Sequence, residues 1–153
     1  MLITFDETAK LITEGKLLHI AGTEKLLKKL PKGKWIGGST EYFMAKEGGK
    51  VSGELLFVTE FSCVNFSIKS YDTGNIPLVM EDSYDSGYTI IIVPFDSEVH
   101  KEYAKNAANY EKMFLRTIVG WISGVNLGTV KSRLSRARFA LRELINKSER
   151  LNV

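Results

Sequence analysis

The sequence predicts an α/β protein with a central mixed sheet, flanking helices and a long, basic, amphipathic C-terminal helix. Two observations indicate this class. Segments with the 3.6-residue spacing of helices alternate with short runs of β-forming residues in the first half of the chain. The last part of the chain carries an apolar stripe at helical spacing, bordered by cations. A mixed α+β arrangement is the alternative that this pattern leaves open.

Local start and stop signals place the individual elements. Asp6 and Glu7 put acidic groups in the first turn of a short helix that Gly15 ends, and Thr23 is a cap-type residue before a second helix. We expect helices over about residues 6–14, 23–30, 98–121 and 130–145, strands over 16–21, 34–37, 55–58, 63–68 and 88–93, and loops over 72–77 and 81–87.

Length and composition indicate one folded body with a small appendage. The chain has 153 residues, of which 44% are hydrophobic and 25% charged, as in a globular protein. We expect an α/β body over residues 1–118 and a separate C-terminal segment over residues 119–153. The most apolar stretch, residues 88–95, is far shorter than the roughly 20 residues of a membrane span. No secretory pattern is visible at the N-terminus, so we expect a cytoplasmic protein without a membrane partner.

Basic charge is concentrated at the C-terminal end. Residues 126–153 hold seven lysines and arginines against two glutamates, a net charge of +5, whereas the whole chain carries +3. Five of the six arginines lie in this segment, and arginine suits contacts to phosphates and base edges. This asymmetry points to a nucleic-acid partner, although charged residues on a terminal helix also occur as a simple solvated face.

The C-terminal segment also has the spacing of a helix-turn-helix. Apolar residues share one stripe of the expected helix, with cations along both of its flanks. Upstream, Gly120 and Gly124 supply a small residue and a turn before Val130, as two closely crossing helices require. The residues of the stripe are Val130, Leu134, Ala137, Leu141, Leu144 and Ile145.

Residues 127–144, and the turn before them, closely resemble the recognition helix of region 4 in extracytoplasmic-function sigma factors. The resemblance covers about residues 119–145. In that family the helix contacts the −35 promoter element. The resemblance therefore implies DNA-facing roles for Lys131, Ser132, Arg133, Ser135 and Arg136. Nothing in the chain resembles region 2 of these factors, so a complete sigma factor is not expected.

A glycine-rich stretch in the body is a candidate ligand site. Gly37, Gly38, Ser39 and Thr40 follow a predicted strand, and backbone N–H groups and hydroxyls at such a point can bind an anion or a carboxylate. A tight turn without a ligand is the alternative. Residues 35–51 are also similar to FIST sensory domains, with a resemblance over about residues 10–125 that implies binding of a small ligand such as an amino acid.

The remaining chemistry-bearing residues predict no catalysis. His19 and His100 lack metal-ligand spacing, and the acidic residues of the 81–87 loop lack the calcium-loop pattern, so we interpret them as structural or solvated. Cys63 is the only cysteine, which excludes an internal disulfide. We expect no enzyme activity and no cofactor.

The sequence therefore favours a DNA-binding, transcription-related protein with a small body that senses a ligand. The alternative is a FIST-like ligand-binding or otherwise uncharacterised α/β protein whose C-terminal helix only packs or forms a homodimer. A small enzyme that uses Ser39 and Thr40 is a third class, for which no base is apparent.

Overall fold

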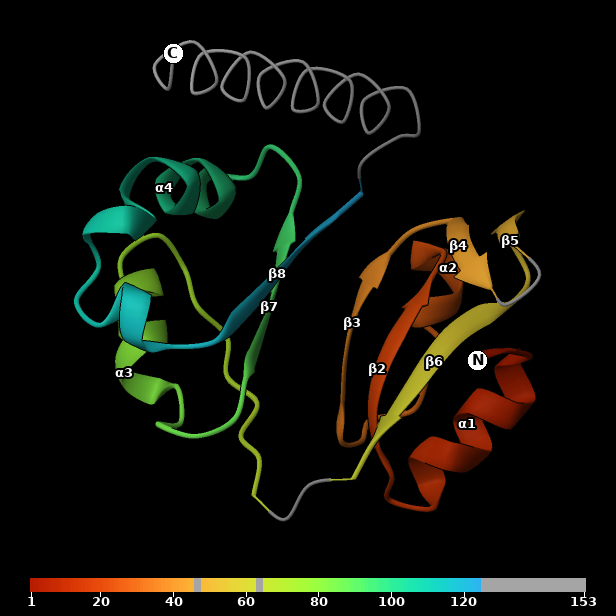
Figure 1. The fold of residues 1–153 in the computed structure, drawn as a ribbon. Helices are drawn as coiled ribbons and strands as arrows, with labels where there is room; N and C mark the ends of the chain where they lie inside the picture. Colours follow the sequence, from red (N-terminus) through yellow and green to blue (C-terminus); the bar gives the residue numbers. More distant parts are fainter. Residues whose placement is uncertain (46–47, 63–64, 125–153) are drawn as a thin grey trace, which may run out of the picture.

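The computed structural model describes residues 1–45, 48–62 and 65–124, and it has the predicted mixed α/β class. Two lobes lie side by side, a first lobe of residues 1–62 and a second lobe of residues 65–124 (Figure 1). Each lobe places its helices on the outside and turns one face of a sheet toward the other lobe (Figure 1).

The first lobe is built on a mixed sheet. Its strand order over the described residues is β1-β6-β2-β3, with β2 and β3 parallel and β6 antiparallel to both β1 and β2. A hairpin of β4 and β5 lies beyond the end of β3 (Figure 1). The elements of this lobe are β1 (Leu2–Ile3), α1 (Phe5–Thr13), β2 (Leu17–Gly22), α2 (Glu24–Leu27), β3 (Trp35–Ser39), β4 (Tyr42–Ala45), β5 (Gly48–Val51) and β6 (Leu56–Phe61).

Helix α1 forms where the capping pattern predicts it. The hydroxyl of Thr4 accepts a hydrogen bond from the Glu7 N–H at 3.3 Å, and the Glu7 carboxylate accepts one from the Thr4 N–H at 2.9 Å. Its apolar face and α2 cover one side of the sheet. The buried residues of this core are Ile12, Leu18, Ile20, Leu30, Leu56 and Val58.

The second lobe contains a parallel pair of strands covered by short helices. Its core joins Ile91 and Val93 of β7 to Val79 and Met80 of α3, with tyrosines of the outer helical turns packed against them. The elements are η1 (Ile76–Leu78), α3 (Val79–Asp82), β7 (Thr89–Pro94), α4 (Glu98–Asn106), η2 (Ala107–Asn109), η3 (Met113–Leu115) and β8 (Ile118–Ser123).

The structure corrects the expected helix over residues 98–121. The helix ends at Asn106, and residues 118–123 form β8, which pairs with β7 in parallel. The pairing with a distant strand outweighs the local helical spacing. Between the end of α4 and β8, Lys112 adopts a left-handed backbone (φ 63°) that a continuous helix would not contain. Residues 119–123 are therefore part of the body's sheet rather than the first helix of a helix-turn-helix, and the body extends beyond the expected boundary at 118.

Two further local predictions were wrong. Residues 65–68 pair with no strand in the described part of the chain, although residues 63–68 were expected to form one, and residues 63 and 64 lie outside the described ranges. Strand β3 continues to Ser39, beyond the expected end of this strand at residue 37. The short helical turns over residues 76–82 were not predicted, because this stretch has too few residues to show a helical period.

None of the helices within the described ranges is long and apolar enough to cross a membrane.

We predict that Gly37→Ala destabilises the first lobe, because a Cβ atom at Gly37 would lie 2.3 Å from the carbonyl oxygen of Ile20. The expected loss in the free energy of unfolding is about 1–3 kcal/mol, measured by urea denaturation. Gly120→Ala in β8 is the control, since its Cβ meets nothing within 4 Å. Equal stability of the two variants would contradict the close approach of β2 and β3.

Candidate functional site

A cleft of about 750 Å³ lies between the two lobes, and the first lobe supplies one of its walls. Along β2, Leu18 and Ile20 point into the core beneath the helices. Side chains alternate along a strand, so Leu17, which precedes Leu18, points to the opposite face of the sheet. Leu17 lines the cleft together with Ile36 of β3 and Phe61 of β6. These three side chains are only half-buried, so the protein itself leaves this apolar face incompletely covered.

The second lobe supplies the facing wall. Ile91 and Val93 of β7 pack against the lobe's own helices, so Ile90 and Ile92 point toward the first lobe, where they are half-buried. Residues 65–71 run along the cleft and also line it. The walls are therefore mainly aliphatic and aromatic.

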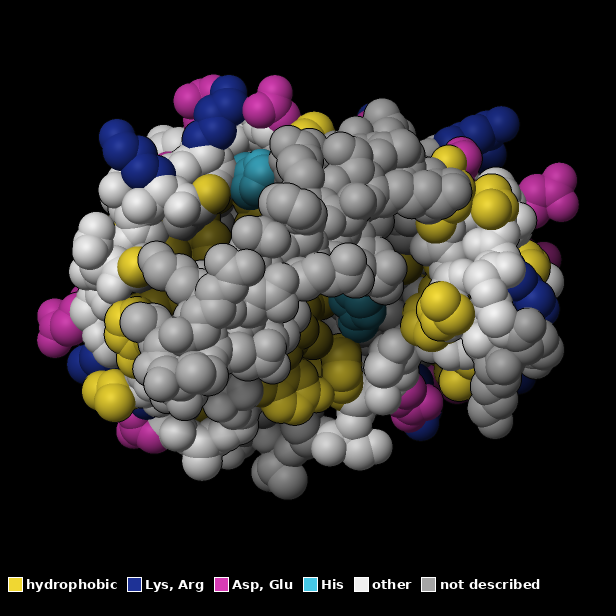
Figure 2. Space-filling model, turned by 45° about the horizontal axis from the view of Figure 1, so that its top comes forward, with side chains coloured by type: hydrophobic (Ala, Val, Ile, Leu, Met, Phe, Trp, Pro, Cys, Tyr) yellow, Lys and Arg dark blue, Asp and Glu magenta, His cyan; other side chains and the backbone are white. Residues whose placement is uncertain are grey.

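Contacts at two places hold the lobes together around the cleft. The ring of Phe61 meets the ring of Tyr88 edge to face, with centroids 6.2 Å apart. At the carboxyl ends of the strands, the N–H of Gly124 donates a hydrogen bond to the carbonyl of Ser39 at 3.0 Å. Hydrophobic side chains lie recessed between the lobes, whereas charged side chains gather at the outer rim (Figure 2).

One polar network borders this apolar space. The Lys69 ammonium pairs with Oδ1 of Asp82, and the Tyr71 hydroxyl donates to Oδ2 of the same carboxylate at 2.8 Å. The hydrogen bond from Lys69, and then that from Tyr71, lowers the pKa of Asp82. Burial, followed by the hydrogen bond to Asp82, raises the pKa of Tyr71 to about 12. At neutral pH Asp82 is therefore a carboxylate and Tyr71 a protonated phenol.

Two hydroxyls of the cleft wall, those of Ser83 and Thr89, are hydrogen-bonded within the second lobe. Ser83 donates to the carbonyl of Val79 at 2.6 Å, and Thr89 donates to the Ser83 hydroxyl at 2.9 Å. These bonds tie the end of α3 to the start of β7. Ser83 and Thr89 therefore shape the wall behind the polar network.

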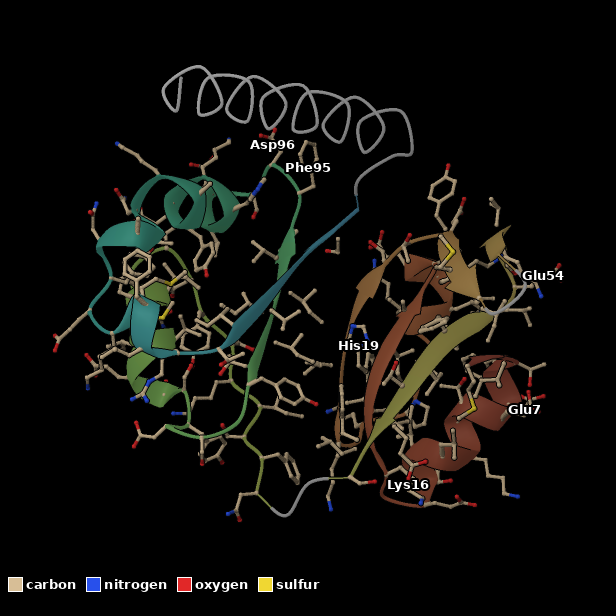
Figure 3. The ribbon with its side chains drawn as sticks, viewed as in Figure 1. Glu7, Lys16, His19, Glu54, Phe95 and Asp96 are labelled. Atoms are coloured by element: carbon tan, nitrogen blue, oxygen red, sulfur yellow. The ribbon has the colours of Figure 1, made fainter. Side chains whose placement is uncertain are left out.

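His19 lies on the same side of β2 as the cleft wall. Its position between Leu18 and Ile20 turns the imidazole away from the helices, and it points toward the side where β7 and β8 lie (Figure 3). Burial lowers the pKa of His19. The imidazole is consequently neutral at physiological pH.

The glycine-rich ligand site predicted from sequence does not form as a turn. Gly37, Gly38 and Ser39 lie in β3, in register with Ile20, Ala21 and Gly22 of β2. The Thr40 N–H donates to the Gly22 carbonyl at 2.8 Å, and the Thr40 hydroxyl accepts from the Tyr42 N–H at 3.1 Å. Binding of a ligand by these residues stays a prediction. None of these residues lines the cleft.

The other sequence candidates have mixed outcomes. His100 accepts a hydrogen bond from the Asp96 N–H at 3.1 Å at the start of α4, which is a structural role. The acidic residues expected to be solvated are partly paired, Asp82 with Lys69 and Asp85 with Arg116. Among the described residues no group of His, Cys, Asp and Glu could hold a metal ion. The DNA-facing candidates, Lys131, Ser132, Arg133, Ser135 and Arg136, lie outside the described residues, as does Cys63.

Sequence reasoning missed Lys69 and Tyr71 as site residues. They lie 13 and 11 residues from Asp82, in the short stretch between the predicted strand at 63–68 and the predicted loop at 72–77. The available signal was the cluster of aromatic and apolar side chains around Lys69, since Phe66, Ile68 and Tyr71 are unusual in an exposed connection.

The fold and the cleft define a two-lobed α/β protein whose distinctive feature is an apolar space between two small sheets. The chain belongs to the DUF6976 family, described as a family of unknown function, whose family model matches residues 3–139. The match covers the described body and continues into the segment that resembles sigma factors. Neither the curated proteins nor the solved structures gave a match.

We predict that His19 makes stability depend on pH. Its pKa in the folded protein lies below the ordinary value of 6.5, so the unfolded chain takes up the proton first as the pH falls. The contribution of His19 to the free energy of unfolding is therefore complete above about pH 6.5 and is lost as the pH falls through the lowered pKa. Urea denaturation between pH 7.5 and 5 measures this slope.

The variant His19→Gln should flatten the pH dependence, whereas His100→Gln keeps His19 and should retain it. An unchanged slope in His19→Gln would show that the imidazole is not desolvated in the folded protein.

Proposed function

We propose that this protein binds a small, largely apolar organic molecule in the cleft between its lobes. The observation that carries the proposal is the pair of facing walls, Leu17, Ile36 and Phe61 on one side and Ile90 and Ile92 on the other, around about 750 Å³ of space. This volume lies in the range of small-molecule sites, which are typically apolar with a few polar groups that fix orientation.

Burial of these walls by a ligand would be favourable. Each wall side chain is half-buried, so an apolar ligand removes water from both faces at once. The contacts between Phe61 and Tyr88 and between Gly124 and Ser39 already join the lobes around the space, so little ordering is required on binding. A preformed site of this kind favours a compact molecule over an extended protein partner.

We predict that the neutral fluorophore N-phenyl-1-naphthylamine binds in the cleft and that Ile92→Trp weakens its binding at least about tenfold, because the indole would fill the space opposite Ile36. A fluorescence titration measures the affinity. Ile36→Trp fills the cleft from the other wall and should have the same effect. Met44→Trp, at a position 77% exposed on the β4–β5 hairpin, is the control and should bind as the wild type does.

Circular dichroism establishes that each variant is folded before its affinity is compared. Undiminished binding in both filled variants, or no binding by the wild type, would refute a ligand site in this cleft.

Nucleic-acid binding by the C-terminal segment is a second candidate function, favoured by its charge. Residues 126–153 carry +5, and their resemblance to the region 4 recognition helix implies contacts through Lys131, Arg133 and Arg136. Because residues 119–123 form β8, DNA binding here would use the C-terminal segment without a preceding helix at those positions. In both proposals the protein works in the cytoplasm, where small metabolites and DNA are both accessible.

We predict salt-dependent affinity for a promoter-like duplex, measured by fluorescence anisotropy at several salt concentrations. Replacing Arg133 and Arg136 together by alanine should reduce the slope of log K against log salt by about 2, because two phosphate contacts are lost. Lys28→Ala combined with Lys101→Ala removes the same charge from the body and is the control. If both double variants behave alike, the C-terminal arginines have no specific role.

A further inference from the structure

The polar network at the cleft carries spare hydrogen-bond donors on Lys69. Both carboxylate oxygens of Asp82 already accept, Oδ1 from Lys69 and Oδ2 from Tyr71. The Lys69 ammonium has three N–H donors, and Asp82 is its only bonded partner among the described residues. N–H groups of Lys69 therefore remain for a ligand, whereas each oxygen of Asp82 already has a partner.

The geometry also favours Lys69 as the group that meets a ligand. Its side chain is 49% exposed, compared with 30% for Asp82, and it lines the same cleft as Ile90 and Ile92. Asp82 holds the ammonium in place, so less side-chain freedom is lost when a ligand binds. The Tyr71 hydroxyl holds the other oxygen of Asp82, so the carboxylate is fixed from both sides.

The charge balance points in the same direction. Asp82 and Lys69 neutralise each other, so a cationic ligand would have to displace Lys69 from Asp82 and leave that ammonium without its partner. An anionic ligand can add to the remaining N–H groups of Lys69 without breaking either bond to Asp82. The hydroxyls of Ser67 and Ser70, which line the cleft on either side of Lys69, offer further donors.

We propose that the natural ligand is an amphipathic anion, with an apolar body between the walls of the cleft and a carboxylate or similar oxyanion bound to Lys69. This inference rests on the proposed ligand-binding function and names the chemical class of the ligand. The apolar body supplies burial against Ile36, Phe61 and Ile92, and the ammonium fixes the direction in which the molecule lies.

Displacement of bound N-phenyl-1-naphthylamine tests the charge preference with three probes of equal chain length, namely decanoate, 1-decanol and decylamine. We expect decanoate to displace the fluorophore at about tenfold lower concentration than 1-decanol, and decylamine to be the weakest. In Lys69→Met the advantage of decanoate should disappear, while 1-decanol should bind within about twofold of its wild-type affinity.

Matched variants separate a specific role of Lys69 from a general effect of charge. Lys101→Met removes a lysine of similar exposure that pairs with Glu98 outside the cleft, and it should leave all three affinities unchanged. Lys69→Gln keeps a polar donor and should give an intermediate decanoate affinity, and it replaces Lys69→Met if that variant does not fold.

The outcomes distinguish the two proposals. If 1-decanol binds and decanoate binds no better, or if decylamine binds best and loses its affinity in Asp82→Asn, the cleft is a ligand site but the anionic ligand is refuted. If none of the three probes displaces a fluorophore that binds in the cleft, the anionic ligand is refuted while the ligand site stands. If the fluorophore itself does not bind, both proposals fail. A decanoate preference that persists in Lys69→Met would also overturn the role of Lys69.

Discussion

Within the described residues, the four-stranded sheet and the β7–β8 pair each pack helices on one face, and their other faces are turned toward each other (Figure 1). Side chains alternate between the two faces of a sheet along each strand. A sheet with apolar side chains on both faces must therefore pack on both sides, or leave apolar groups in contact with water. In the first lobe the helices bury Leu18 and Ile20, and in the second lobe the helical turns bury Ile91 and Val93. The intervening residues meet across the cleft, and the two-lobed shape follows from this arrangement.

Two contacts join the lobes at the borders of the space. The hydrogen bond from Gly124 to Ser39 joins the ends of β8 and β3, and the ring contact between Phe61 and Tyr88 joins β6 to the start of β7. Between these points the side chains of residues 65–71 border the space instead of a further strand. The charged network of Lys69, Asp82 and Tyr71 lies on this border. Its hydrogen bonds fix the orientation of these polar side chains beside the apolar cleft.

The two proposed functions depend on different parts of the chain. Ligand binding rests on the described lobes and on the positions of Ile36, Ile92 and Lys69. Nucleic-acid binding rests on the composition of residues 126–153 and on their resemblance to a recognition helix. The family match spans residues 3–139 and so includes both the cleft and much of the basic segment. The two functions are compatible in one protein that senses a ligand and regulates transcription, as the sequence predicts.

The sequence by itself determined the mixed α/β class, the capped helix α1 and the strands β2 and β7, because caps, glycine stops and runs of β-forming residues act over a few neighbours. It also determined the concentration of basic charge at the C-terminal end. Only the tertiary structure decided that residues 118–123 form a strand, because the partner that stabilises them, β7, lies about 30 residues away in sequence. The tertiary structure also decided the cleft and the place of Lys69 beside it, because both form only where segments distant in the sequence meet.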